Sequence, residues 1–134
     1  MENIKDAANC CLNCKVKPCS QKGCPINTNI PEFINEVKNE NYKKAYDILQ
    51  ENNICSYICS LVCPQEEQCE GSCVRGVKST PVHIGLLEKN VNEWAIENNY
   101  EYAITTKESN GKKVAIVGSG PAGISCATEL LKEG

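Results

Sequence analysis

The sequence predicts a mostly α-helical, cysteine-rich domain followed by the first strand–helix unit of a second domain. Ten of the 11 cysteines fall within the first 73 residues, in two tight groups. Between and after these groups, apolar residues recur three and four positions apart, which is the period of an amphipathic helix. Near the end of the chain, a run of Val and Ile leads into a glycine-rich turn. This pattern is typical of a strand that enters a phosphate-binding loop.

The cysteine-rich part is predicted to alternate helices with cysteine loops. Pro31 suits the first turn of one helix, and Val82, Leu86 and Val91 lie on one face of another. The predicted order is a short helix (3–10), a first cysteine loop (11–30), a helix from residue 30 that continues at helical spacing through 42–49, one or two helical turns (54–62), a second cysteine loop (63–80) and an amphipathic helix (82–98).

The remaining residues are predicted to start a second domain. Residues 99–111 are polar and end in Ser-Asn-Gly, as a linker does. The Val and Ile content of 112–117 predicts a buried parallel strand, and residues 121–133 predict the helix after it. We therefore expect a cysteine domain at 1–98, a linker at 99–111 and the truncated start of a Rossmann-like domain at 112–134.

The composition argues against several classes of partner. The 134 residues carry 17 acidic and 14 basic side chains, a net charge of −3, and Arg75 is the only arginine. This balance gives no basic face for a nucleic acid. No apolar run approaches the roughly 20 residues that cross a membrane, and the polar start of the chain does not resemble a signal peptide. We expect a cytoplasmic protein with neither nucleic-acid nor membrane partners.

The spacing of the cysteines favours metal ligation over disulfides. The cytosol keeps thiols reduced, and 11 is an odd number. Two strings of thiols stand out: Cys11, Cys14, Cys19 and Cys24, then Cys63, Cys69 and Cys73. Zinc sites usually come as two clean pairs of ligands, whereas these loops hold strings of four and three thiols, which favours iron–sulfur clusters, although a structural zinc domain stays open. Cys24 and Cys63 each precede a proline, and in two-cluster ferredoxins such a cysteine ligates the other cluster.

The order of the motifs resembles a known family. The motifs are Cys-Leu-x-Cys-x4-Cys, Gly-Cys-Pro, Ile-Pro-Glu-Phe-Ile, Val-Cys-Pro-Gln-Glu-x2-Cys-Glu-Gly-x-Cys, Pro-Val-x-Ile-Gly-x-Leu-Glu and Val-Gly-Ser-Gly-Pro-Ala-Gly. They resemble the N-terminal part of the glutamate synthase small (β) subunit family. That family includes the N-terminal domain of dihydropyrimidine dehydrogenase and the large subunit of NADH-dependent reduced ferredoxin:NADP oxidoreductase. The resemblance implies an α-helical ferredoxin-like domain with two [4Fe–4S] clusters, followed by FAD-binding and NADPH-binding domains.

The resemblance also implies a ligand set. One cluster would use Cys11, Cys14, Cys19 and Cys73, and the other Cys24, Cys63, Cys69 and the carboxylate of Glu88. Cys59 competes with Glu88, because it precedes Cys63 by four residues on a predicted helix turn. The family usually has three residues between the third cysteine and Cys-Pro, whereas this chain has four. The default for the remaining cysteines, Cys10, Cys55, Cys59 and Cys126, is that of small buried hydrophobic residues.

The glycine-rich turn is the predicted nucleotide site. Its fingerprint is Gly118-x-Gly120-x-x-Gly123, with Pro121 and Ala122 inside it. Such glycines let the backbone approach a pyrophosphate at a helix N-terminus, and the resemblance implies FAD as the ligand. The next strand of this fold, with its ribose-binding acid about 20 residues after the loop, is absent. We therefore expect this chain to be the front of a longer protein.

These features predict an oxidoreductase component with no catalytic residue of its own. In the expected mechanism, NADPH or NADH reduces FAD in the missing part. The two clusters then relay electrons between FAD and a large catalytic subunit, as the resemblance to NADPH-dependent glutamate synthase implies. The alternatives are a ferredoxin-like docking or electron-carrier module of a ferredoxin:NADP or pyrimidine-reducing complex, and a structural zinc domain without redox activity.

Overall fold

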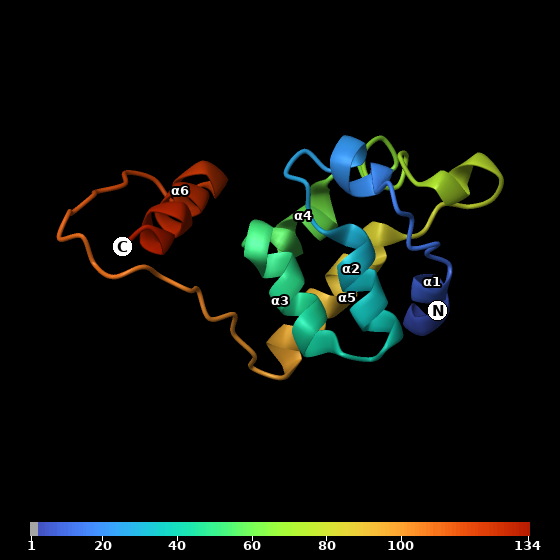
Figure 1. The fold of residues 1–134 in the computed structure, drawn as a ribbon, viewed down its shortest axis with the longest axis horizontal. Helices are drawn as coiled ribbons and strands as arrows, with labels where there is room; N and C mark the ends of the chain where they lie inside the picture. The colour runs from blue at the N-terminus through green and yellow to red at the C-terminus, as the bar shows by residue number, and fades with distance from the viewer. Residues whose placement is uncertain (1–2) are drawn as a thin grey trace. The chain divides into compact units, whose positions relative to one another are not determined.

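The computed structural model describes residues 3–134, which fall into two compact units, Met1–Glu101 and Tyr102–Gly134. All of the regular structure in the described residues is helical (Figure 1). The first unit contains α1 (Ile4–Asn9), a π-helical turn (Cys19–Gly23), α2 (Ile30–Lys38), α3 (Tyr42–Asn52), α4 (Ser56–Val62), a 3-10 turn (Val74–Val77) and α5 (Ile84–Glu97), and the second unit contains α6 (Pro121–Lys132). The predicted mostly α-helical class is confirmed. The helix predicted to continue from residue 30 through 42–49 is wrong, because the chain turns at Glu40, which has a φ of +58°, and forms two helices, α2 and α3. The other helices predicted in the first unit are present.

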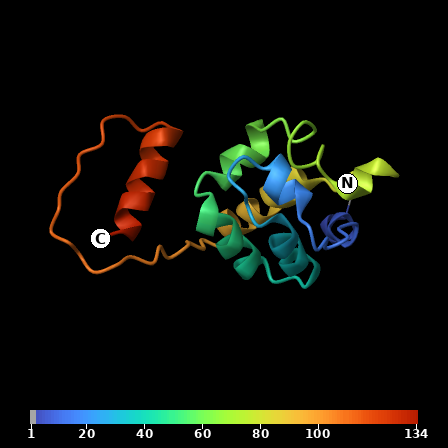
Figure 2. The same cartoon turned by 45° about the horizontal axis from the view of Figure 1, so that its top comes forward.

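The core of the first unit forms around α5, which packs against α1, α2, α3 and α4. Leu87, Val91 and Ala95 follow one another at helical spacing on α5 and are all buried. From α2, Phe33 and Val37 enter the same core. Figure 2 shows α5 running through the centre of this unit with the other helices around it. The core therefore ties together α4 and α5, which both carry predicted ligands.

A buried polar network joins α3, α4 and α5 inside this core. The Asn92 side-chain oxygen accepts hydrogen bonds from the Ser56 hydroxyl at 2.8 Å and from the Gln50 amide at 3.4 Å. The Gln50 amide also donates to Ser56 Oγ at 3.0 Å, and the Asn92 amide donates to the Glu88 carbonyl at 2.8 Å. All three side chains are buried. Such a satisfied network fixes the three helices in one register, because any shift would leave buried polar atoms unpaired.

The two cysteine loops lie on the same side of the helices and touch one another. Gly23, at the end of the π-helical turn, approaches the second loop so closely that a Cβ atom there would lie 2.6 Å from the Gln68 carbonyl oxygen and 2.8 Å from Cys69 Cα. Only glycine fits at this distance. The first loop is therefore seated directly on the backbone of the second.

The second unit consists of an extended segment and α6. No β-strand occurs in residues 3–134, so the strand predicted for 112–117 is wrong for this chain. A strand needs a neighbouring strand to pair its backbone groups, and here the would-be buried side chains of Val114 and Val117 are exposed. The helix predicted for 121–133 is confirmed as α6. Among the described residues, every helix is too short or too polar to cross a membrane.

Candidate metal centre

The first unit contains two cavities that are lined by thiols. The Cys11 cavity, of about 20 Å³, is lined by the thiols of Cys11, Cys14, Cys19 and Cys73. The Cys24 cavity, of about 140 Å³, is lined by Cys24, Cys59, Cys63, Cys69 and the carboxylate of Glu88. The structure thus brings together the eight predicted ligands as two sets of four, and it adds Cys59 to the second set.

The first loop owes its shape to local backbone features and to ties with α2. Asn13 has a φ of +48°, a left-handed conformation that Asn tolerates better than most residues. The resulting sharp turn lets Cys11 and Cys14 line the same cavity. The Lys38 ammonium, at the end of α2, donates to the Cys11 carbonyl at 2.8 Å. The start of the loop is therefore held against the far end of α2.

The π-helical turn accommodates the four residues between Cys19 and Cys24. The Cys24 amide donates to the Cys19 carbonyl at 2.9 Å, a bond across five residues. A wider turn of this kind takes up one more residue than an α-helical turn, so Cys19 can line one cavity while Cys24 lines the other. The family-like spacing of three residues would remove this wide turn.

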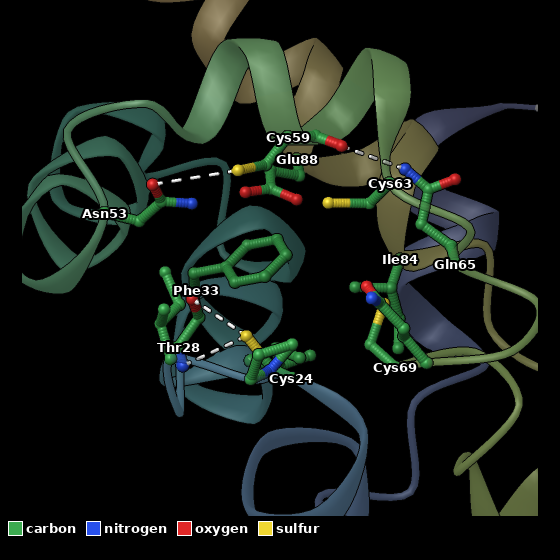
Figure 3. Close-up of a pocket in the computed structure, with 14 residues that line it drawn as sticks. Cys24, Thr28, Phe33, Asn53, Cys59, Cys63, Gln65, Cys69, Ile84 and Glu88 are labelled. Carbon is green, nitrogen blue, oxygen red and sulfur yellow. Dashed lines mark hydrogen bonds between the residues drawn. The ribbon is translucent and has the colours of Figure 1, made fainter. Parts of the chain in front are cut away.

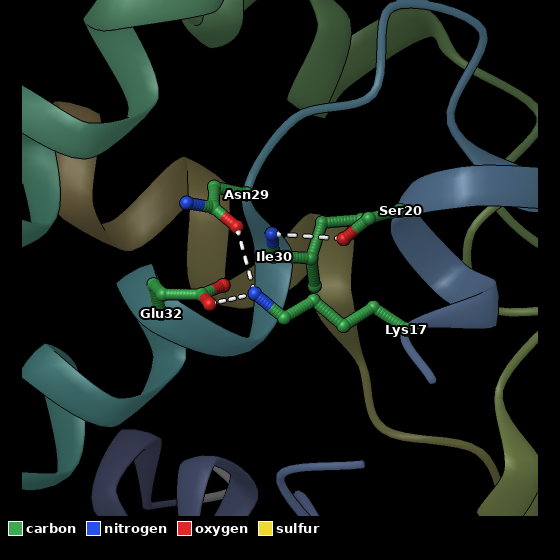
Figure 4. Close-up of polar contacts among 5 residues, drawn as sticks. All are labelled: Lys17, Ser20, Asn29, Ile30 and Glu32. Atoms are coloured by element: carbon green, nitrogen blue, oxygen red, sulfur yellow. Dashed lines mark hydrogen bonds and ion pairs between the residues drawn. The ribbon is translucent and has the colours of Figure 1, made fainter. Parts of the chain in front are cut away.

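Side chains from the first loop hold it to the start of α2, as Figure 4 shows. The Ser20 hydroxyl accepts a hydrogen bond at 3.2 Å from the Ile30 amide, which also donates to the Thr28 carbonyl at 2.8 Å. The Lys17 ammonium forms an ion pair with Glu32 and contacts the Asn29 side-chain oxygen at 3.4 Å. These contacts fix the segment between Cys19 and α2, in which Cys24 lies.

The Cys24 cavity receives side chains from four segments (Figure 3). Cys59 and Cys63 project from α4 and its end, Glu88 projects from α5, and Cys69 comes from the second loop. Cys24 comes from the first loop, and its sulfur accepts a hydrogen bond from the Thr28 amide at 3.4 Å. Such bonds to sulfur help to set the reduction potential of a cluster. The cavity is complete only when both loops and both helices are in place.

Two side chains of the second loop anchor it to these helices. The Gln65 amide donates to the carbonyls of Cys59 at 3.3 Å and Ser60 at 3.1 Å, near the end of α4. The Glu70 carboxylate accepts from the Gly85 amide at 3.0 Å, at the start of α5. A carboxylate is stabilised at a helix N-terminus, where amides are unpaired and the dipole is positive. Each anchor therefore fixes a ligand-bearing helix relative to the loop.

Burial raises the pKa of three donors of the Cys24 cavity, Cys63, Cys69 and Glu88. Burial raises the pKa of Cys69 to about 12, with smaller contributions from the Glu70 and Glu88 carboxylates. It raises the pKa of Cys63 to about 11, with Cys59 as the next cause, and the pKa of Glu88 to about 8. In the Cys11 cavity, burial likewise raises the pKa of Cys19. A metal that binds these groups must displace their protons, so binding and proton release are coupled.

The chemistry of the two donor sets fits an iron–sulfur cluster. Among residues 3–134, no three His, Cys, Asp or Glu side chains converge closely enough to hold one metal ion. A zinc ion requires four donors within about 2.0–2.3 Å of one point. An iron–sulfur cluster is larger, and thiolates bind it from around a cavity. Soft sulfur donors spread around a space lined by apolar residues such as Ile30 and Ile84 fit such a cluster.

The cysteines that lie outside the two cavities differ in how far they match their predicted default. None of Cys10, Cys55 and Cys126 is fully buried, and Cys126 is exposed. Cys10 lies just after α1, and Cys55 precedes α4. Cys59 is likewise only partly buried, since it lines the Cys24 cavity. The prediction of small buried hydrophobic residues is therefore wrong for Cys126, whereas Cys10 is partly buried against the hydrophobic core.

Sequence reasoning missed the side chains that position the ligands. The residues missed are Gln65, Glu70 and Asn92. Each contacts a segment that becomes its neighbour only after folding. Their residue types carry no signal that distinguishes them from surface polar residues. Thr28 is different, because a Thr four residues after a cysteine can turn back to that sulfur, and its amide does so here.

The glycine-rich turn in the second unit has a tight backbone geometry, although the strand predicted for 112–117 does not form. Gly118 has a φ of +109°, which only glycine adopts readily. A Cβ on Gly123 would lie 2.6 Å from the Gly118 carbonyl oxygen, so the turn closes tightly on the first turn of α6. Gly120, just before Pro121 and Ala122, has open space around it. These glycines therefore make a tight turn into α6, with open space at Gly120.

Comparison with known proteins gives a family match over most of the chain. Residues 1–100 match the family described as dihydropyrimidine dehydrogenase domain II, 4Fe-4S cluster. The chain is 36% identical over 131 residues to the NAD-dependent dihydropyrimidine dehydrogenase subunit PreT of Escherichia coli. It is 35% identical over 130 residues to the glutamate synthase [NADPH] small chain of Escherichia coli, and 34% identical over 134 residues to that of Azospirillum brasilense.

These alignments cover 97–99% of this chain but only a minor part of each relative. They cover 31% of the PreT subunit and 27% and 28% of the two glutamate synthase small chains. The chain therefore spans less than a third of the length of these relatives. All three relatives are, by name, subunits or chains of oxidoreductases.

Proposed function

Because this chain belongs to the family described as dihydropyrimidine dehydrogenase domain II, 4Fe-4S cluster, we propose that it relays electrons through two [4Fe–4S] clusters within an NAD(P)H-dependent iron–sulfur flavoprotein. The observation that carries this proposal is the division of the predicted ligands between two cavities of one helical unit. Eight ligands are the number that two such clusters need.

In this proposal, the chain's own residues hold and insulate the redox centres. Cys11, Cys14, Cys19 and Cys73 bind one cluster, and Cys24, Cys63, Cys69 and Glu88 bind the other. When bound, each cluster supplies one-electron transfer. Apolar residues such as Ile30 and Ile84, which line both cavities, limit access of water to the sulfur atoms. The hydrogen bond from the Thr28 amide to the Cys24 sulfur would tune the reduction potential of the cluster in the Cys24 cavity and not that of the other cluster.

The second unit is proposed to begin the flavin-binding domain. Gly118, Gly120, Pro121, Ala122 and Gly123 would bring the backbone close to the pyrophosphate of FAD at the start of α6. The tight closure of Gly123 on Gly118 supports this role. Residues 1–98 would then form the cluster domain, 99–111 the linker and 112–134 the first part of the flavin domain. Reduction of FAD by NADPH or NADH would occur in the full-length protein.

The relatives suggest two candidates for the partner subunit and its final electron acceptor. Similarity to glutamate synthase small chains favours a large catalytic subunit that receives electrons for glutamate synthesis. Similarity to the PreT subunit, at nearly the same identity, favours a pyrimidine-reducing complex. Reconstitution of the full-length protein with each candidate large subunit, followed by NAD(P)H oxidation with 2-oxoglutarate plus glutamine or with a pyrimidine, distinguishes these two functions.

The cluster assignment is tested by metal analysis of the anaerobically purified protein. We expect about eight irons and eight sulfides per chain, with a broad brown absorbance. Cys14→Ser and Cys63→Ser should each remove about half of the iron, because they act on different cavities, and the double variant should remove nearly all of it. Cys126→Ser, at an exposed thiol outside both cavities, is the matched control and should keep all of it. Stoichiometric zinc without sulfide would contradict the proposal.

A further inference from the structure

The Cys24 cavity offers five donors, one more than a [4Fe–4S] cluster uses. Four are the proposed ligands, and the fifth is Cys59. Cys59 and Cys63 are four residues apart, and the Cys63 amide donates to the Cys59 carbonyl at 3.0 Å, so the two side chains lie one helical turn apart on α4. Both therefore reach the cavity from the same wall (Figure 3).

The Cys59 side chain is held by two contacts, a hydrogen bond with the Cys63 side chain and another with Asn53. It donates to the Asn53 side-chain oxygen over 3.8 Å, on the side away from Cys63 (Figure 3). That oxygen also accepts the Cys55 amide at 3.1 Å. Asn53 therefore keeps a hydrogen-bond partner if the Cys59 sulfur turns away from it. Rotation of Cys59 towards the cavity leaves no buried polar atom unpaired at Asn53.

The Glu88 carboxylate shares the space next to this thiol. It points into the cavity between the sulfurs of Cys59 and Cys63 (Figure 3), and among the described residues its oxygens make no hydrogen bond or ion pair that would hold it there. Only its place on α5 keeps it at the cavity, since the Asn92 amide bonds the Glu88 backbone and not the side chain. A carboxylate without further anchors is an exchangeable ligand.

We propose that Cys59 is a reserve ligand of the cluster in the Cys24 cavity, able to take the position of Glu88. The proposal rests on the proposed function, since it requires a cluster in this cavity. Iron in a sulfide cluster prefers soft thiolate to hard carboxylate donors. In the exchange, Cys59 would supply its Sγ as a thiolate donor in place of a Glu88 oxygen, and the thiol proton would pass to the released Glu88 carboxylate. No electron is transferred. The cluster then has four cysteine ligands.

The experiment compares five forms of the full chain, reconstituted without oxygen: wild type, Glu88→Ala, Cys59→Ser, Glu88→Ala with Cys59→Ser, and Glu88→Ala with Cys55→Ser. The last is the matched control, because Cys55 directly precedes α4, four residues before Cys59, and does not line the cavity. Iron and sulfide per chain are measured, the reduced samples are examined by electron paramagnetic resonance, and far-UV circular dichroism checks the helical fold of each form.

We expect wild type, both single variants and the Cys55 control to retain about eight irons. Glu88→Ala with Cys59→Ser should fall to about half, with the signal of one cluster lost or converted to a three-iron form. Loss of half of the iron in Glu88→Ala alone would overturn the proposal, as would full retention in the double variant with Cys59→Ser. Loss in Cys59→Ser alone would make Cys59 a resident ligand and also overturn it. A wild-type protein with no iron in this cavity would instead contradict the proposed function.

Discussion

Gly23 is the residue at which the two cysteine loops meet. The space for a side chain is filled by backbone atoms of Gln68 and Cys69, which cannot move aside as a flexible side chain can. Gly23 directly precedes Cys24, and Cys69 lines the same cavity as Cys24. A single missing Cβ therefore sets the separation of two proposed ligands from different loops.

Gly23→Ala should push the loops apart. We expect the variant to lose about 1–3 kcal/mol of stability, as is usual when a closely packed site is overfilled, and to lose iron from the Cys24 cavity. Gly76→Ala is the control in the second loop, because a Cβ there would make only an ordinary contact of 3.5 Å with Pro81. Anaerobic thermal melting and iron analysis of both variants make the comparison. Equal melting temperatures and iron contents would show that the loop contact is unimportant.

Helix α5 carries Glu88 and is fixed at two points along its length. The Glu70 carboxylate bonds its first turn, and Asn92 bonds Ser56 of α4 and Gln50 of α3. Since Asn92 lies one turn after Glu88, the network holds that part of α5 against the helix that carries Cys59 and Cys63. The positions of these three donors are thereby coupled through polar side chains that never enter the cavity.

Asn92→Leu should break this coupling. The Ser56 hydroxyl would lose its buried acceptor, which costs about 1–3 kcal/mol, and the melting temperature should fall by several degrees. Asn98→Leu is a matched control, because the Asn98 amide also donates to a carbonyl four residues earlier, that of Trp94 at 2.8 Å, but on the exposed end of α5. Its effect should stay within about 0.5 kcal/mol. Similar losses in both variants would argue against the network.

The helices that could be predicted from the sequence are those that depend on a local pattern of residues. The helices at Pro31 and around Val91 follow from helix-start chemistry and from apolar spacing, and both form as expected. The π-helical turn at Cys19–Gly23 was not predicted, because its wide bond depends on where Cys19 and Cys24 must point in the folded unit. The predicted strand at 112–117 fails for a similar reason, since a strand exists only when a neighbour pairs with it.

The two units of the molecule differ in what stabilises them. The first has a buried core around Phe33, Leu87 and Val91. In the second, Thr128 is the buried residue, and Ile116, Val117 and Leu131 remain partly or fully exposed. The first unit therefore has the means to fold by itself, while the apolar residues of the second lack a covering layer.

A fragment of residues 1–101 should accordingly fold and bind the same iron as the whole chain. We expect about eight irons per fragment after anaerobic reconstitution and an unchanged melting temperature, because the core and both cavities lie within these residues. Iron analysis and circular dichroism of the fragment and the whole chain test this. A fragment that holds less iron would show that the second unit supports the cluster domain.

The donor residues of the site could be predicted from the sequence, but the side chains that hold them in position could not. Cysteine spacing predicts metal ligation, and resemblance to a family was needed to divide the ligands into two sets and to single out Glu88. The sequence offers Cys59 and Glu88 as alternatives, and the structure places both at one cavity, where α4 and α5 pack together. Anchors such as Gln65 and Glu70 act between segments whose proximity depends on the complete fold.

The interleaving of the loops has a consequence for synthesis of the protein. Cys11, Cys14 and Cys19 are translated early, but the wall of their cavity is completed only by Cys73, and the Cys24 cavity is completed only by Glu88. A growing chain thus exposes a set of reduced thiols for some fifty residues before either cavity exists. Iron delivered during that interval meets no finished site. Under the proposed function, a cluster in the Cys24 cavity would be inserted only after residue 88 has left the ribosomal tunnel, before the waiting thiols are oxidised.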